Sequence, residues 1–122
     1  MSDGVIFDLD GLLADTEPMW NESARRLLDR LDLARSMAAI IGSDQVERGK
    51  PAPDIFLLAA KGLGLTPERC TVLEDAALGV DAALAAGMTC ICVPSPQTPA
   101  ESAARAHRVV KSLEELKLDD FR

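Results

Sequence analysis

Val5-Ile6-Phe7-Asp8-Leu9-Asp10-Gly11 is the stretch of sequence that decides the fold. It begins with β-branched and aromatic residues, as a buried strand does, and it ends in acids and a glycine, as a tight turn does. We therefore predict a strand over Val5–Leu9. Because residues two apart on a strand point the same way, the carboxylates of Asp8 and Asp10 are expected to face one site.

Strand-like and helix-like segments alternate along the rest of the chain. The patterns predict helices over 20–33 (capped by Asp15 or Thr16), 54–61 and 76–86, a short helix after the 94–99 loop, strands over 38–41, 71–73 and 89–93, and an edge strand over 107–110. Ser112 and Glu115 predict a capping box for a last helix. This alternation predicts an α/β fold with a mostly parallel, Rossmann-like sheet covered on both faces. In such folds the chemistry gathers at the carboxyl ends of the strands.

Length and composition indicate one small domain, residues 1–122. Apolar residues are 48% of the chain but aromatic residues only 3%, so the core must consist mainly of Leu, Val, Ile and Ala. The net charge of −7 argues against a nucleic-acid partner, and no apolar run approaches the roughly 20 residues of a membrane span. Cys90 and Cys92 are expected to be small hydrophobic residues on one strand face. With no room for a signal peptide before the first strand, we expect a cytoplasmic protein.

A second acidic pair, Glu74-Asp75, follows the strand predicted over 71–73. Together with Asp8 and Asp10 it would give the carboxyl edge of the sheet four carboxyl groups. Hard oxygen ligands in that number suit Mg²⁺ better than Zn²⁺. The alternative for any one of these acids is that it caps the helix that follows its strand.

Lys50 is the cation expected at this site. It lies between Gly49 and Pro51, just before the helix predicted over 54–61, whose dipole favours anions. A lysine in such a stiffened turn is a good phosphate anchor. The alternative is an ordinary solvated surface lysine.

Three ordered segments resemble the motifs of the haloacid dehalogenase-like family, in its sugar-phosphatase and β-phosphoglucomutase-like branch. They are Phe7-Asp8-Leu9-Asp10-Gly11-Leu12-Leu13-Ala14-Asp15-Thr16-Glu17, Gly49-Lys50-Pro51-Ala52-Pro53-Asp54-Ile55-Phe56, and Leu73-Glu74-Asp75-Ala76 with Gly79 and the alanine-rich run after it.

The resemblance implies a role for each site residue. Asp8 would be the nucleophile, and Asp10 the general acid and base. Mg²⁺ would be bound by Asp8, Asp10 through its carbonyl, and Asp75, with Glu74 helping directly or through water. Lys50 and Gly11 would bind the phosphoryl group.

The chain departs from the family pattern between the first motif and Ile40. That segment is too short for the family's cap domain, and no apolar strand precedes Ser23, the nearest residue to the second motif's Ser or Thr. We expect either the 38–41 strand or a neighbouring chain to fill the gap beside the first strand, and self-association would relieve an unpaired edge.

Two functions follow as hypotheses. The first is a Mg²⁺-dependent phosphatase of small phosphate esters, sugar phosphates above all, which works through an aspartyl phosphate and is weakened by the missing parts. The second is a non-catalytic, truncated or designed scaffold that at most binds Mg²⁺ or phosphate.

Overall fold

The computed structural model of the protein describes residues 4–8 and 46–121. Several predicted features lie outside these residues: the 20–33 helix, the 38–41 strand, Asp10, Gly11 and Ser23. The side chain of Asp8 also lies outside the description, although its backbone is included.

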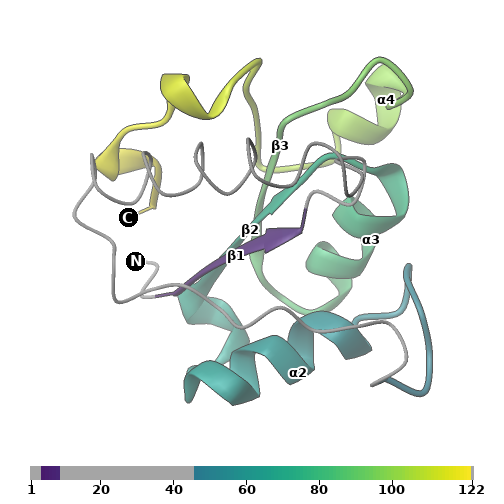
Figure 1. Ribbon diagram of the computed structural model, residues 1–122, viewed down its shortest axis with the longest axis vertical. Coiled ribbons are helices and arrows are strands. Elements are labelled where there is room, and N and C mark those ends of the chain that lie inside the picture. The colour runs from purple at the N-terminus through teal and green to yellow at the C-terminus, as the bar shows by residue number, and fades with distance from the viewer. Residues whose placement is uncertain (1–3, 9–45, 122) are drawn as a thin grey trace, which may run out of the picture.

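The described sheet has four strands, and all of its pairings are parallel. Their order is β1-β2-β3-β4, with β1 at Gly4–Asp8, β2 at Cys70–Glu74, β3 at Thr89–Cys92 and β4 at Arg108–Val109 (Figure 1). The predicted parallel α/β fold is confirmed. β1 forms one edge of the described sheet, and because the 38–41 strand lies outside the description, pairing or self-association at this edge stays a prediction.

The helices follow the predicted segments closely. They are α2 at Asp54–Leu63, α3 at Ala77–Ala85 and α4 at Ala100–Ala103, with 3-10 turns η4 at Pro67–Arg69, η5 at Leu113–Glu115 and η6 at Leu118–Phe121. Over residues 46–121, no helix is both long and apolar enough to cross a membrane.

Glycine ends both long helices by taking a left-handed conformation. Gly64 has φ 71° and Gly87 has φ 79°, a region that L side chains rarely adopt. The next amides, of Leu65 and Met88, then turn back to donate to the carbonyls of Ala60 and Ala83. α2 continues past Gly62 and ends at Leu63, two residues beyond its predicted end at Lys61. The reason is that Gly64, and not Gly62, takes the left-handed conformation that ends the helix.

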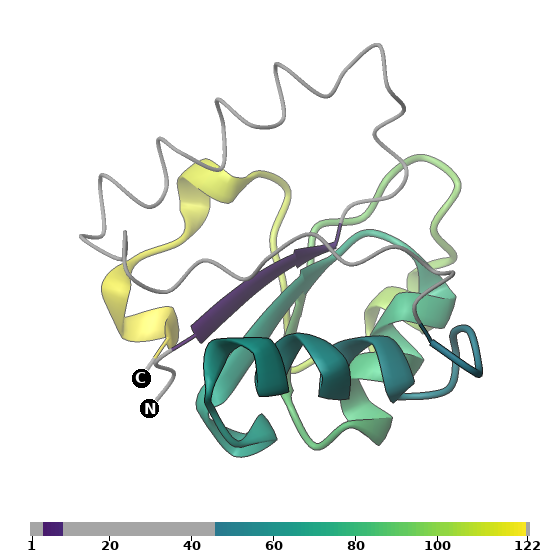
Figure 2. The same ribbon diagram turned by 60° about the horizontal axis from the view of Figure 1, so that its bottom comes forward.

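Two hydrophobic clusters form the core, one on each face of the sheet, because side chains alternate along each strand. On one face, Ile6, Val72 and Cys90 pack with residues of α2, α3 and α4. On the other face, strand residues pack against the C-terminal 3-10 turns, with Val5, Leu73, Ile91, Val110, Leu113, Leu116 and Phe121 all buried. Figure 2 shows α2 and α3 below the strands and the yellow C-terminal turns on the other side.

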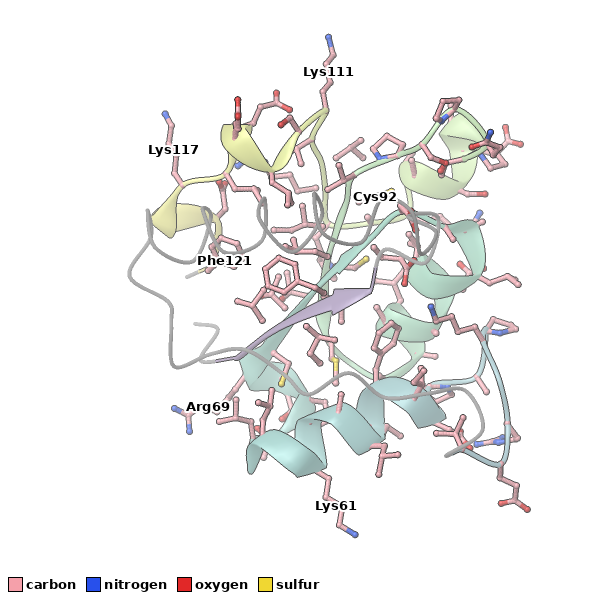
Figure 3. All side chains as sticks on the ribbon, in the orientation of Figure 1. Lys61, Arg69, Cys92, Lys111, Lys117 and Phe121 are labelled. Atoms are coloured by element: carbon pink, nitrogen blue, oxygen red, sulfur yellow. The ribbon has the colours of Figure 1, made fainter. Side chains whose placement is uncertain are left out.

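The C-terminal turns begin at the predicted capping box. The Ser112 hydroxyl accepts from the amide of Glu114 at 3.2 Å, and the Ser112 amide donates to the Glu115 carboxylate at 3.0 Å. The segment it caps is a single 3-10 turn, η5, and not the predicted longer helix. Its Leu113 reaches the core, as does Phe121 of η6, labelled in Figure 3.

The cysteines are buried core residues, as predicted. Cys70, Cys90 and Cys92 are free thiols with no exposed surface, and the two on β3 share the cluster beneath α3. Burial, reinforced by the nearby Glu74 charge, raises the pKa of Cys90 to about 12 and that of Cys92 to about 11. These thiols therefore stay protonated and unreactive at neutral pH.

Replacement of Cys90 by alanine should make the free energy of unfolding depend less on pH above pH 9. The unfolded thiol ionises near pH 9 while the folded thiol holds its proton to about pH 12, so its contribution is complete below pH 9 and falls as pH rises. The wild-type free energy of unfolding should fall more steeply between pH 9 and 11, by up to about 1.4 kcal/mol per pH unit. Urea unfolding at pH 7.5, 9, 10 and 11 measures this, and parallel curves would contradict it.

Candidate active site

The acidic residues meet at the carboxyl edge of the sheet. The register of β1 and β2 places Asp8 beside Glu74, and the register of β2 and β3 places Glu74 beside Cys92. The amide of Val93 donates to the Glu74 carbonyl at 2.9 Å and so extends the β3 contact past the end of the strand. The described members of the two acidic pairs, Asp8 and Glu74, therefore lie on neighbouring strands, whereas Asp10 lies outside the described residues.

Glu74 is fully buried and is held at both carboxylate oxygens. Its Oε1 accepts from the amides of Asp75 and Ala76, each at 3.1 Å, while its Oε2 lies 3.3 Å from the Nζ of Lys50. Burial of an unpaired carboxylate costs several kcal/mol, and these three donors offset that cost. Glu74 therefore ties the turn between β2 and α3 to the lysine that precedes α2.

Lys50 reaches the site from the turn before α2, where a cis peptide bond joins it to Pro51. Its side chain is only 15% exposed, and its Nζ lies 5.6 Å from the ring centre of the buried Phe56. By contrast, the cations labelled in Figure 3 all project outward from the molecule: Lys61, Arg69, Lys111 and Lys117. Lys50 is therefore a largely buried lysine paired with Glu74, and not a solvated surface lysine.

Gly79, in the first turn of α3, leaves the space that the Glu74 side chain fills. A Cβ at this position would lie 1.9 Å from Cδ and from Oε2 of Glu74, far inside van der Waals contact. The helix can therefore cover the buried carboxylate only where it carries no side chain. The sequence placed Gly79 in the last of the three segments that resemble the family's motifs, but it gave no reason for a glycine there. The contact with Glu74 is that reason.

Asp75 is also buried, 7% exposed, and the loop after β3 holds its backbone. The hydroxyl of Thr98 donates to the Asp75 carbonyl. Beside this contact is an open hollow of about 330 Å³, lined by Asp75, Ala76, Ala77, Ser95, Gln97, Thr98 and Pro99. Sequence reasoning treated residues 94–99 only as a loop, although Ser95 and Thr98, each followed by a proline at a strand end, were a signal of a hydrogen-bonded turn.

The structure thus brings together three predicted site residues, Lys50, Glu74 and Asp75, with the backbone of Asp8 next to them. The buried carboxylates of Glu74 and Asp75 at the end of β2 supply hard oxygens, the kind of donor that suits Mg²⁺. Among the described residues there is no group of three or more His, Cys, Asp or Glu side chains that would hold an ion. The expected metal set also needs Asp8 and Asp10, so it stays a prediction.

A parallel α/β sheet with acids and a largely buried lysine at the carboxyl ends of its strands defines a Rossmann-like domain whose site lies at that edge. The model of the haloacid dehalogenase-like hydrolase family matches residues 21–87, more than half of the chain. The chain belongs to the haloacid dehalogenase-like hydrolase family, as its motifs predicted.

Three relatives show the branch of the family. The chain is 46% identical over 70 residues to the fructose-1-phosphate phosphatase YqaB of Escherichia coli (strain K12), which is 57% of this chain and 37% of that protein. The crystal structure of CbbY from Rhodobacter sphaeroides in complex with phosphate is 41% identical, with a TM-score of 0.61, over 70% of this chain and 37% of CbbY. That of β-phosphoglucomutase from Clostridium difficile is 29% identical, with a TM-score of 0.60, over 91% of this chain and 52% of the enzyme.

These matches place the chain in the sugar-phosphatase and β-phosphoglucomutase-like branch. The chain spans only about a third to a half of the length of these three relatives.

Replacement of Gly79 by alanine should destabilise the fold by about 2–4 kcal/mol, because the new methyl group would displace a fully buried carboxylate from its donors. Gly62→Ala is the matched control: this glycine is also helical, nothing lies within 4 Å of a Cβ there, and alanine should be neutral or stabilising by up to about 1 kcal/mol. Urea unfolding gives both values.

A double-mutant cycle tests whether contact with Glu74 causes the loss of stability in Gly79→Ala. In a Glu74→Ala background the clash is gone, so Gly79→Ala should cost much less than in the wild type. An equal cost in the two backgrounds would show that Gly79 matters for a reason other than Glu74.

Proposed function

We propose that this protein hydrolyses small phosphate esters, with sugar phosphates as the preferred class, in a Mg²⁺-dependent reaction through a phosphorylated Asp8. The observation that carries the proposal is the position of Lys50, held by the buried Glu74 on the strand directly beside Asp8. A fixed cation next to a strand-end carboxylate is the arrangement that phosphoryl transfer needs, because its catalysis is chiefly positioning and charge stabilisation.

The site residues divide the reaction among them. Asp8 attacks phosphorus and forms an aspartyl phosphate, which divides the displacement into two easier steps. Asp10 gives a proton to the leaving oxygen and then takes one from the attacking water. Lys50 and Gly11 would bind the phosphoryl oxygens. Asp8, Asp10 and Asp75 would hold Mg²⁺, which would supply positive charge against the phosphate oxygens.

The contacts of Glu74 support a positioning role for it in this scheme. Its two oxygens contact the amides of Asp75 and Ala76 and the ammonium of Lys50. It therefore fixes the direction of a metal-binding acid and of the phosphate-binding cation together. Any contact of Glu74 with Mg²⁺ would pass through water or would need one of these donors to move.

The substrate class rests on the relatives. The E. coli protein acts on fructose 1-phosphate by name, and the R. sphaeroides protein was solved with phosphate. We therefore propose phosphorylated sugars and similar small esters for this chain. The competing function, a scaffold that binds Mg²⁺ or phosphate without turnover, shares the geometry and differs only in catalysis.

Replacement of Asp8 by asparagine should abolish hydrolysis of p-nitrophenyl phosphate, with a loss of at least about a thousandfold, because the shape remains while the nucleophile is lost. EDTA should have a similar effect on the wild type. Asp81→Asn is the control, since Asp81 pairs with Arg105 on the surface between α3 and α4. Turnover in Asp8→Asn equal to that of the wild type would contradict the assignment, and a wild type without turnover that still binds Mg²⁺ would favour the scaffold.

Discrimination among substrates should be weak. The segment between Glu17 and Ile40 is too short for a cap domain, so little chain would contact the part of a substrate that is not phosphate. Lys50 and Mg²⁺ would recognise a group that all phosphate esters share. Efficiencies should differ by about tenfold, or 1.4 kcal/mol, across sugar phosphates, nucleotides and aryl phosphates at fixed Mg²⁺ and pH. A preference of a thousandfold for one ester would mean that a specific pocket exists.

A further inference from the structure

We propose that Thr98 is a positioning residue for the metal-binding acid Asp75, and that the loop after β3 thereby sets the affinity of the site for Mg²⁺. This inference rests on the proposed function, but Thr98 itself lies outside the three segments that resemble the family's motifs. It starts from the hydrogen bonds of a single hydroxyl group.

Thr98 Oγ1 has three polar contacts. It donates to the Asp75 carbonyl, it accepts from the Ser95 amide at 3.0 Å, and it lies 3.1 Å from Ser95 Oγ. Since a threonine hydroxyl has one hydrogen, and that hydrogen goes to Asp75, the Ser95 hydroxyl must be the donor in the third contact. One oxygen thus joins the loop after β3 to the residue after β2.

Together with two other hydrogen bonds, this contact fixes the backbone on both sides of Asp75. The Val93 amide holds the carbonyl of Glu74, Thr98 holds the carbonyl of Asp75, and the Glu74 carboxylate holds the amide of Asp75. The peptide groups on both sides of the Asp75 Cα are therefore fixed, and this sets the direction in which its side chain leaves the backbone. Partners that orient a metal ligand in this way typically change metal affinity by 10–100-fold when they are lost.

The test compares the Mg²⁺ affinity of four proteins by isothermal titration calorimetry at 15 °C, with circular dichroism to show that each is folded. Thr98→Val keeps the shape of the side chain and removes the hydroxyl, so the dissociation constant should rise about tenfold. Thr98→Ser keeps the hydroxyl and should stay within about threefold of the wild type. Thr89→Val makes the same chemical change at the other end of β3 and should leave the affinity unchanged.

Activity supplies a second readout. The Mg²⁺ concentration for half-maximal turnover should rise in Thr98→Val by the same factor, while turnover at saturating Mg²⁺ recovers to near the wild-type value. If Thr98→Val does not fold, Ser95→Ala replaces it; it removes one donor to Thr98 Oγ1 and should weaken Mg²⁺ binding about threefold.

A lower melting temperature with unchanged Mg²⁺ affinity would overturn the inference, since the threonine would then only stabilise the loop. A wild type that binds no Mg²⁺ would overturn the proposed function as well. Mg²⁺ binding by the wild type with equal affinity in Thr98→Val would overturn the positioning role alone.

Discussion

Burial of the Glu74 carboxylate is the constraint on which the rest of this site depends. A carboxylate with no exposed surface must find donors inside the protein, and hydrogen bonds to a charged group contribute about 1.5–3 kcal/mol each. Here the donors are two successive amides of the β2–α3 turn and the Lys50 ammonium. The path of the chain from β2 into α3, and the position of the turn before α2, follow from satisfying one side chain.

The same constraint reaches beyond these donors. α3 packs over the carboxylate only because Gly79 has no Cβ, and Lys50 is guided to it past the buried ring of Phe56. Loops that come from three separate parts of the sequence thus meet at one edge of the sheet with little freedom. If Lys50 binds phosphate as proposed, the position of this cation is already set, and less entropy would be lost on binding.

Sequence patterns predicted the helices and strands more accurately than they predicted the contacts between side chains. β1, α2, β2, α3 and β3 lie within about two residues of their expected bounds, because apolar runs and left-handed glycines act locally. The sequence also placed Lys50, Glu74 and Asp75 at one edge. It did not show that Glu74 binds Lys50, nor that Thr98 holds Asp75, because these partners are 24 and 23 residues apart and only the folded sheet brings them together.

The charges at the carboxyl edge explain why the proposed reaction needs a divalent cation. Among the described residues, the carboxylates of Glu74 and Asp75 face one ammonium, that of Lys50, and Asp8 and Asp10 would add to the negative side, so carboxylates outnumber cations before any substrate arrives. The Nζ of Lys50 lies 3.3 Å from Oε2 of Glu74, so this carboxylate already offsets much of the lysine's positive charge. A phosphate dianion would therefore meet net repulsion, in a protein whose overall charge is −7. The two positive charges of a bound Mg²⁺ would offset the excess of carboxylates, and Lys50 would then be able to attract the phosphoryl oxygens.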